Sequence, residues 1–97
     1  MKDLSLEKLL RLIPKKENGT ITARRLAEIA GCCESYIRKK INEARASGIP
    51  ICSTRFGYYF SDRYEDISET VRFLTRRINT QLKAIDGLKG IKFLMVK

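Results

Sequence analysis

The sequence predicts a mainly α-helical fold with one small β-hairpin, and three observations lead to this expectation. Apolar residues recur at helical spacing in three segments before residue 48 and in a longer segment after residue 62. Between them, residues 49–60 alternate apolar and other residues around a glycine, as two short strands and a turn do. The 97 residues suit one compact domain with an appended element. We therefore expect a domain over residues 1–62 and a C-terminal helix and tail over residues 63–97.

The first segment places its apolar residues on one helix face, at Leu6, Leu9, Leu10 and Ile13. Either Asp3 or Ser5 can cap its start, and Pro14 stops the pattern. The first helix is therefore predicted from Leu4 to Ile13, followed by a loop from Lys15 to Thr20 that contains an Asn-Gly pair.

Two short helices follow in close succession. Thr22 can cap the first of them, Gly31 ends it, and its core face consists of Ala23, Leu26, Ala27 and Ala30. The next helix is predicted from about Glu34 to Ser47, and its core face consists of Ile37, Ile41 and Ala44. Gly48 lies just past its end. Two short helices joined by a tight turn with a glycine form the helix-turn-helix pattern.

The hairpin is predicted from strands over Ile49 to Cys52 and Tyr58 to Phe60, with Gly57 in the turn. Tyr58 and Phe60 share the face that must cover the helices, so we expect them in the core. Phe56 has two interpretations: an exposed aromatic at the hairpin tip, or a side chain that folds back onto the last helix.

A long helix is predicted from Arg63 to Asp86, because Asp62 and Glu65 resemble a capping box and Gly87 suits the position after a helix. An a/d stripe runs along it, with Leu82 beside it: Tyr64, Ile67, Val71, Leu74, Ile78, Gln81 and Ile85. The stripe predicts a homodimer, or else it covers the first helix and the hairpin. The expected dimer residues are Ile67, Val71, Leu74, Ile78, Leu82 and Ile85. Residues 88–96 are either a strand or a docked tail.

The whole sequence is basic, with 20 Lys and Arg against 11 Asp and Glu and a net charge of +9. This balance is expected of a protein that neutralises phosphates, although solubility alone also explains it. Histidine is absent, and the three cysteines include no C-x-x-C pair, so neither a zinc site nor a disulfide framework is expected. Cys32 and Cys33 are either redox-sensitive thiols or, more commonly for free cysteine, small buried hydrophobes.

Several functions are not expected. The chain has no phosphate-binding loop, no metal-binding cluster and no nucleophile paired with a base, so we expect no enzyme activity, no cofactor and no small-molecule ligand. It has no signal-peptide core and no apolar run of about 18 residues, so we expect a cytoplasmic protein that does not cross a membrane.

Residues 21–61 resemble the biotin-repressor type of winged helix-turn-helix domain. The resemblance rests on Leu26-Ala27, the Gly31 turn, Ile37, Ile41, Gly48-Ile49 and Gly57-Tyr58. It implies that the third helix enters the major groove of double-stranded DNA and that the hairpin is a wing on the backbone or minor groove. So short a chain is not expected to carry the repressor's biotin-ligase domain. Cys33 also departs from the family, which usually has a serine cap there. The size and the trailing helix are similar to small winged-helix proteins of phages and prophages.

On the third helix, Ser35, Lys39 and Asn42 lie opposite the core, with Tyr36 and Arg38 flanking them. The start of the second helix and the hairpin tip add candidates for phosphate contact. An ordinary solvated helix face is the alternative. The candidate DNA-contacting residues are Thr22, Arg24, Arg25, Ser35, Tyr36, Arg38, Lys39, Lys40, Asn42, Thr54 and Arg55.

We therefore expect a winged helix-turn-helix followed by a long C-terminal helix, acting as a dimeric transcriptional regulator of a paired DNA site. Two alternatives remain: a phage DNA replication or packaging component, and an adaptor that uses the winged helix to bind another protein.

Overall fold

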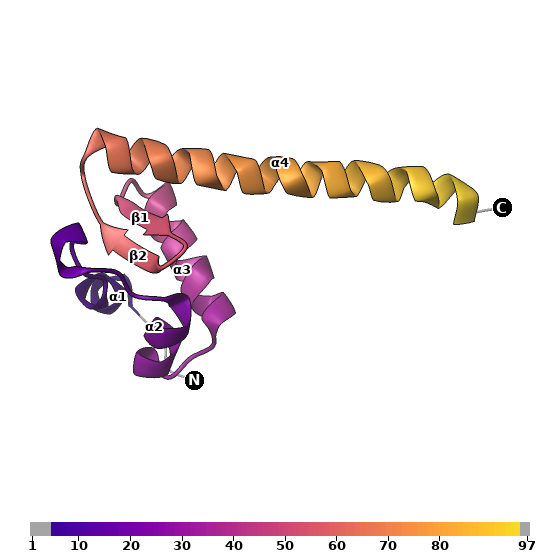
Figure 1. Ribbon diagram of the computed structural model, residues 1–97. Helices are drawn as coiled ribbons and strands as arrows, with labels where there is room; N and C mark the ends of the chain where they lie inside the picture. Colours follow the sequence, from indigo (N-terminus) through magenta and orange to yellow (C-terminus); the bar gives the residue numbers. More distant parts are fainter. Residues whose placement is uncertain (1–4, 96–97) are drawn as a thin grey trace. The chain divides into compact units, whose positions relative to one another are not determined.

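The computed structural model describes the backbone of residues 5–95 and the side chains of residues 5–90. It confirms the predicted class: a mainly helical chain with a two-stranded antiparallel hairpin and a long C-terminal helix (Figure 1). The chain divides into two compact units, Met1–Ile67 and Ser68–Lys97. We call Met1–Ile67 the winged unit. None of the helices in the described region combines the length and apolar character needed to span a bilayer.

Helix α1 (Leu6–Leu12) begins after Ser5, whose hydroxyl oxygen accepts a hydrogen bond of 3.2 Å from the Lys8 backbone N–H. Ser5 is therefore a cap of this helix; Asp3, the other candidate, and the predicted start at Leu4 lie outside the described residues. Ile13 is already extended, because the residue before a proline disfavours helical backbone. The helix consequently ends one residue earlier than predicted.

The predicted loop after α1 is more regular than expected. It contains a 3₁₀ helix, η1 (Lys16–Asn18), flanked by two isolated β-bridges that pair Lys15 with Phe60 and Ile21 with Tyr58. A single bridge leaves no alternation of apolar residues in the sequence, so the pattern analysis missed it. The loop therefore runs alongside the hairpin.

Helices α2 (Ala23–Ala30) and α3 (Glu34–Ala46) form the predicted helix-turn-helix. The Thr22 hydroxyl oxygen accepts a hydrogen bond of 3.0 Å from the Arg25 N–H, and Gly31 ends α2 in the left-handed conformation, with φ of 72°. The helix-turn-helix packs on α1 through a common core of Leu9, Ile13, Ala23, Leu26, Ala27, Ile37, Ile41, Ala44 and Ile51. The predicted core faces of α2 and α3 are confirmed, with Ala30 only partly buried.

Strands β1 (Ile51–Thr54) and β2 (Gly57–Phe60) pair in antiparallel register from Ile51 opposite Phe60 to Thr54 opposite Gly57. The predicted start of the first strand at Ile49 is wrong. The Ile49 N–H donates to the Ala44 carbonyl at 3.1 Å and so completes the end of α3, and Pro50 has no N–H to donate. Gly57 was predicted within the turn, but it is the first residue of β2.

Both faces of the hairpin are covered. Tyr58 and Phe60 pack against the core, as expected. On the opposite face, the paired residues Cys52 and Tyr59 are only 1% and 5% exposed. Tyr59 was not among the residues predicted to be buried. Three consecutive aromatics at residues 58–60 were the available signal, because neighbouring strand residues point to opposite faces.

Helix α4 (Tyr64–Met95) has 32 residues, which corresponds to about 48 Å. The predicted end at Asp86 is wrong, since the helix continues through Gly87 and Gly90. A helical glycine costs only about 1 kcal/mol relative to alanine, and no proline follows to stop the chain. Residues 88–95 are consequently helical, so the strand alternative is wrong, and Val96 lies outside the described residues.

The start of α4 also differs from the prediction. The helix begins at Tyr64, one residue later than predicted, and the Ser61 hydroxyl oxygen accepts a hydrogen bond of 3.2 Å from the Arg63 N–H just before it. Glu65 forms an ion pair with Arg63, with 3.8 Å between Oε1 and Nε. The Ser61 hydrogen bond thus fixes the turn just before the helix, and it does not involve the predicted pair of Asp62 and Glu65.

Candidate nucleic-acid interface

The start of α2 and the wing are hydrogen-bonded to each other. Ile21 and Tyr58 exchange two backbone hydrogen bonds, of 3.0 and 2.7 Å, and the Thr20 hydroxyl donates to the Phe56 carbonyl at 3.1 Å. Gly57 makes this approach possible, because a Cβ atom there would lie 2.5 Å from the Ile21 carbonyl oxygen. The candidate phosphate contacts of α2 and of the hairpin tip are therefore held beside one another.

Arg45 links helix α3 to the wing. Its Nε donates to the Ile51 carbonyl at 2.8 Å and its Nη2 to the Ser53 hydroxyl at 3.1 Å. Burial lowers the pKa of the Arg45 guanidinium. Arg45 was not among the predicted site residues. Its position four residues after Ile41, at the edge of the core face, was the signal that it points inward.

The α3 candidates separate into exposed and half-buried residues. Ser35, Arg38, Lys39 and Asn42 are exposed, as the helical spacing predicted. Tyr36 packs against the core, and the Lys40 ammonium lies 5.6 Å from the Tyr36 ring centroid. The exposed residues offer donors to guanine from Arg38 and Lys39, and both a donor and an acceptor to adenine from Asn42.

The α2 candidates stand where the helix begins. Thr22, Arg24 and Arg25 are all exposed, but the Thr22 oxygen already accepts the N–H of Arg25. The cap therefore satisfies one of the backbone N–H groups that the start of a helix can otherwise offer to a phosphate. The two arginine side chains remain at the surface, and each forms an ion pair with Glu28.

The hairpin tip presents Thr54, Arg55 and Phe56 to solvent. The Thr54 hydroxyl oxygen accepts a hydrogen bond of 3.0 Å from the Phe56 N–H, which fixes the turn. The Arg55 guanidinium lies 4.9 Å from the Phe56 ring centroid, and Phe56 is 64% exposed. A cation stacked on an aromatic ring at the tip can contact a phosphate or enter a minor groove.

Acidic side chains accompany most of the candidate cations, which the sequence analysis did not foresee. Ion pairs join Glu34 to Arg38 at 2.9 Å and Glu43 to Lys40 at 3.4 Å, and Glu28 lies 3.9 Å from Arg24 and 3.3 Å from Arg25. Of the candidate cations, all of which lie within residues 5–90, Lys39 and Arg55 form no ion pair. The signal was present in the sequence, because each of these acidic residues stands three or four positions from its basic partner on the same helix.

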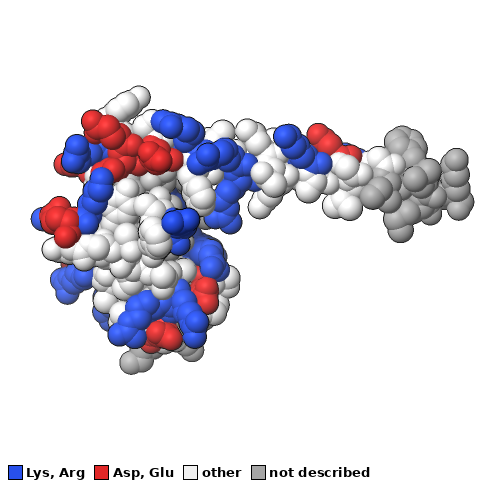
Figure 2. Space-filling model, viewed as in Figure 1, with Lys and Arg blue, Asp and Glu red and all other residues white. Residues whose placement is uncertain are grey.

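Figure 2 shows where charge gathers on one face of the protein. Lys and Arg side chains gather at the end of the winged unit that carries α2, with acidic side chains between them, and a larger group of Asp and Glu lies where α4 begins. Charge is thus unevenly distributed over this face. The acidic region contains Asp66, whose hydrogen bonds hold the first turn of α4 in place.

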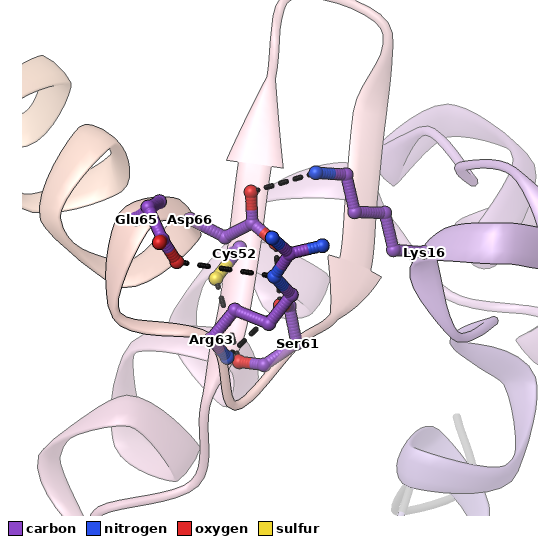
Figure 3. Close-up of polar contacts among 6 residues, drawn as sticks. All are labelled: Lys16, Cys52, Ser61, Arg63, Glu65 and Asp66. Carbon is purple, nitrogen blue, oxygen red and sulfur yellow. Dashed lines mark hydrogen bonds and ion pairs between the residues drawn. The ribbon is translucent and has the colours of Figure 1, made fainter.

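A polar cluster around Asp66 fixes the first turn of α4 within the winged unit (Figure 3). Asp66 accepts hydrogen bonds from the Lys16 ammonium at 2.8 Å and from the Ser61 hydroxyl at 2.6 Å. The Lys16 ammonium, and next the Ser61 hydroxyl, lower the pKa of the Asp66 carboxyl, while Asp66 raises the pKa of Lys16. The cluster joins α4 to η1 and contributes no residue to the candidate interface.

The cysteines differ in exposure. Cys52 is buried, Cys32 is half-buried and Cys33 is exposed, so the expectation of a buried hydrophobe is wrong for Cys33. Cys33 precedes α3 and makes no capping hydrogen bond, as expected of a poor cap. The Ser35 hydroxyl, 3.3 Å from the Cys33 sulfur, lowers the pKa of the Cys33 thiol. Among the described residues no cluster suited to a metal ion is present.

The predicted dimer residues lie along α4, and most of them are exposed within one chain. We define the α4 stripe as Ile67, Val71, Leu74, Ile78, Leu82, Ile85 and Leu88; all are exposed except the half-buried Leu74. Leu88 is 66% exposed and continues the stripe beyond the predicted end of the helix.

By its architecture, the winged unit is a winged helix-turn-helix. Comparison with protein families, with characterised proteins and with solved structures finds no match to this chain.

Proposed function

We propose that the protein binds double-stranded DNA in a sequence-specific manner, as a homodimeric transcriptional regulator in the cytoplasm. The observation that carries the proposal is the exposed polar face of α3, the second helix of a helix-turn-helix that is followed by a wing. In this fold the N-terminal half of that helix reads base edges in the major groove. A net charge of +9 suits a polyanionic partner.

The base-reading role belongs to Arg38, Lys39 and Asn42. Arg38 and Lys39 can donate to the guanine O6 and N7 acceptors, and Asn42 can bond to adenine N6 and N7. Ser35 can donate to or accept from several bases. The backbone-contacting role belongs to Arg24 and Arg25 at the start of α2 and to Arg55 on the wing.

The linkage between α2 and the wing favours simultaneous contact with DNA. The paired Ile21 and Tyr58 hold the two phosphate-binding elements in one arrangement before DNA arrives. Elements that are already ordered lose less conformational entropy when they bind. The wing and α2 therefore act together in fixing the register of α3 in the groove.

The identity of the α4 residues supports a dimer with a second copy of the chain. The seam has β-branched Val71, Ile78 and Ile85 at one set of positions, and the alternate set is Ile67, Leu74, Gln81 and Leu88. β-Branched residues alternating with leucine favour two-stranded coiled coils, and Gln81 is the one polar residue among these seven. In a parallel pair, Arg77 of one copy lies beside Leu82 of the other and Ala84 lies beside Lys89. No two like charges meet at these flanking positions.

Selection of bound sequences from random duplex DNA tests the proposal directly. We expect one preferred site, and replacement of both Arg38 and Lys39 by Ala should weaken binding to it by about 1–3 kcal/mol for each base that is no longer read. The control is Arg11→Ala on α1, which removes an exposed arginine outside the interface.

Two outcomes would count against this function. If the double variant binds the selected site as tightly as the parent, the α3 face does not read the site. If the parent shows no salt-dependent binding to any duplex, the protein-binding adaptor becomes the better explanation.

A further inference from the structure

Three glutamates form ion pairs with basic side chains of the proposed DNA-binding surface. We call Glu28, Glu34 and Glu43 the screening glutamates; they form ion pairs with four of its six basic side chains, namely Arg24, Arg25, Arg38 and Lys40. The other two are Lys39 and Arg55. The six basic side chains and three glutamates leave this surface with a net charge of +3, so its positive charge is halved where the chain is proposed to meet DNA.

This neutralisation acts most strongly on sequence-independent binding. Affinity for unselected DNA comes almost entirely from cations that neutralise phosphates and release counterions. A carboxylate a few ångströms from each cation repels the same phosphates. The screening glutamates therefore lower the affinity that every duplex shares.

The pair of Glu34 and Arg38 has a geometry that base reading can use. Glu34 Oε1 accepts from Arg38 Nη2 at 2.9 Å, and the two side chains remain 44% and 54% exposed. Arginine carries five N–H donors in a planar fork, and the bond to Glu34 uses one of the two on Nη2, so four donors remain. A guanine edge offers two acceptors to such donors, and a guanidinium already held by a carboxylate loses less freedom in binding it.

We propose that Glu34 is a specificity-determining residue: it opposes phosphate binding at every sequence and positions Arg38 for a guanine. This inference rests on the proposed function. Glu34 weakens binding to unselected DNA, while at the selected site the positioned Arg38 offsets that repulsion. The ratio of the two affinities, which is the biologically relevant quantity, is higher with Glu34 than without it.

The test compares Glu34→Gln with Glu7→Gln in the intact protein. Both variants lose one negative charge from a glutamate that pairs with an arginine four residues later; the Glu34 side chain is 44% exposed and that of Glu7 is 77% exposed. Glu7 lies on α1 and contributes nothing to the interface. Binding is measured to the selected duplex and to a scrambled duplex of the same composition, over a range of salt concentrations.

We expect Glu34→Gln to raise the affinity for scrambled duplex by about threefold to tenfold, as removal of one charge near a phosphate predicts. Its salt dependence should steepen by up to about one unit. Affinity for the selected duplex should rise less or fall, so that the specificity ratio drops. Glu7→Gln should change the ratio little.

Equal effects of the two substitutions would overturn the inference, since net charge alone would then explain them. An unchanged affinity of Glu34→Gln for scrambled duplex would also overturn it. Both results leave the proposed function intact provided that the parent prefers its selected site. A parent that binds neither duplex would overturn the inference and the proposed function together.

Discussion

Gly57 combines a positive φ with a close approach to another backbone segment. Its φ is +137°, and a Cβ atom would meet the Ile21 carbonyl oxygen at 2.5 Å. We expect Gly57→Ala to lower the free energy of unfolding by about 1–3 kcal/mol, since both the conformation and the close approach oppose a side chain. Urea denaturation measures the change.

Gly48→Ala is the matched control for this substitution. Gly48 also has a positive φ, of +91°, but nothing lies within 4 Å of its added Cβ. Gly57→Ala should cost more than Gly48→Ala, because only Gly57 approaches another backbone segment. An equal cost would mean that the pairing of the wing with Ile21 does not depend on the glycine.

Asp66 makes stability depend on pH. Its pKa is lowered in the folded protein, first by Lys16 and then by Ser61. A group of this kind contributes its full stability above its unfolded pKa of about 3.9 and loses it as the pH falls through the lower folded value. Asp66→Asn should therefore destabilise the protein at pH 7 and flatten the acid side of its stability profile.

Asp62→Asn is the control for this pH dependence, because Asp62 is exposed and neighbours the cluster without bonding to Lys16. The variants are compared by thermal unfolding between pH 2 and 7. This interval includes the ordinary pKa of a carboxyl group, about 4. Parallel profiles of Asp66→Asn and the parent would contradict the assignment of Asp66 as the responsible carboxylate.

At the scale of elements, the wing makes a prediction separate from that of α3. Arg55 is exposed at the tip, and a phosphate contact releases a counterion without reading a base. Arg55→Ala should weaken binding to selected and scrambled duplexes alike and make the salt dependence shallower by about one unit. Salt titrations measure the slope, with Arg11→Ala as the control.

An unchanged slope for Arg55→Ala would place the wing tip away from DNA. Loss of binding to the selected duplex alone would instead assign Arg55 to base reading.

Element boundaries were predictable where one residue dominates the backbone. Ser5 and Thr22 as caps, and Gly31 as a stop, follow from chemistry local to each position. The end of α4 was not predictable from Gly87, because a glycine stops a helix only when the following residues favour a turn. The start of β1 depends on Ile49 bonding to α3, a contact that the strand pattern does not encode.

The candidate site was predictable where its geometry depends only on residues close in the sequence. Helical spacing predicted which α3 residues are exposed, since only the core direction is needed. The role of Arg45 depends on where β1 packs, and the burial of Tyr59 depends on what covers the far face of the hairpin. The glutamate partners are encoded locally, at spacings of three and four, and were predictable from the same helical geometry as the cations.

At the scale of the whole molecule, the α4 stripe predicts the oligomeric state. Ile78 and Ile85 are 57% and 47% exposed in a single chain, and a second copy would bury them. The parent should sediment as a dimer at tens of micromolar. The double substitution of Ile78→Glu and Ile85→Glu should give a monomer that keeps its winged unit and binds the selected duplex much more weakly.

Asn79→Glu is the control, because it adds a charge to the same helix away from the stripe. It should leave the dimer intact. A parent that sediments as a monomer would contradict the dimer, and a dimeric double variant would place the interface elsewhere on the chain.

The bridge between Ile21 and Tyr58 also determines how the segment before α2 and the hairpin separate during local unfolding. Their two amide hydrogens are each bonded to the other residue's carbonyl, so they become exchangeable with solvent only when the segment before α2 separates from the hairpin. Hydrogen exchange should therefore proceed at similar rates at both amides. One opening event then separates the wing from the start of α2. The proposed DNA contacts of both elements are therefore lost together and not one at a time.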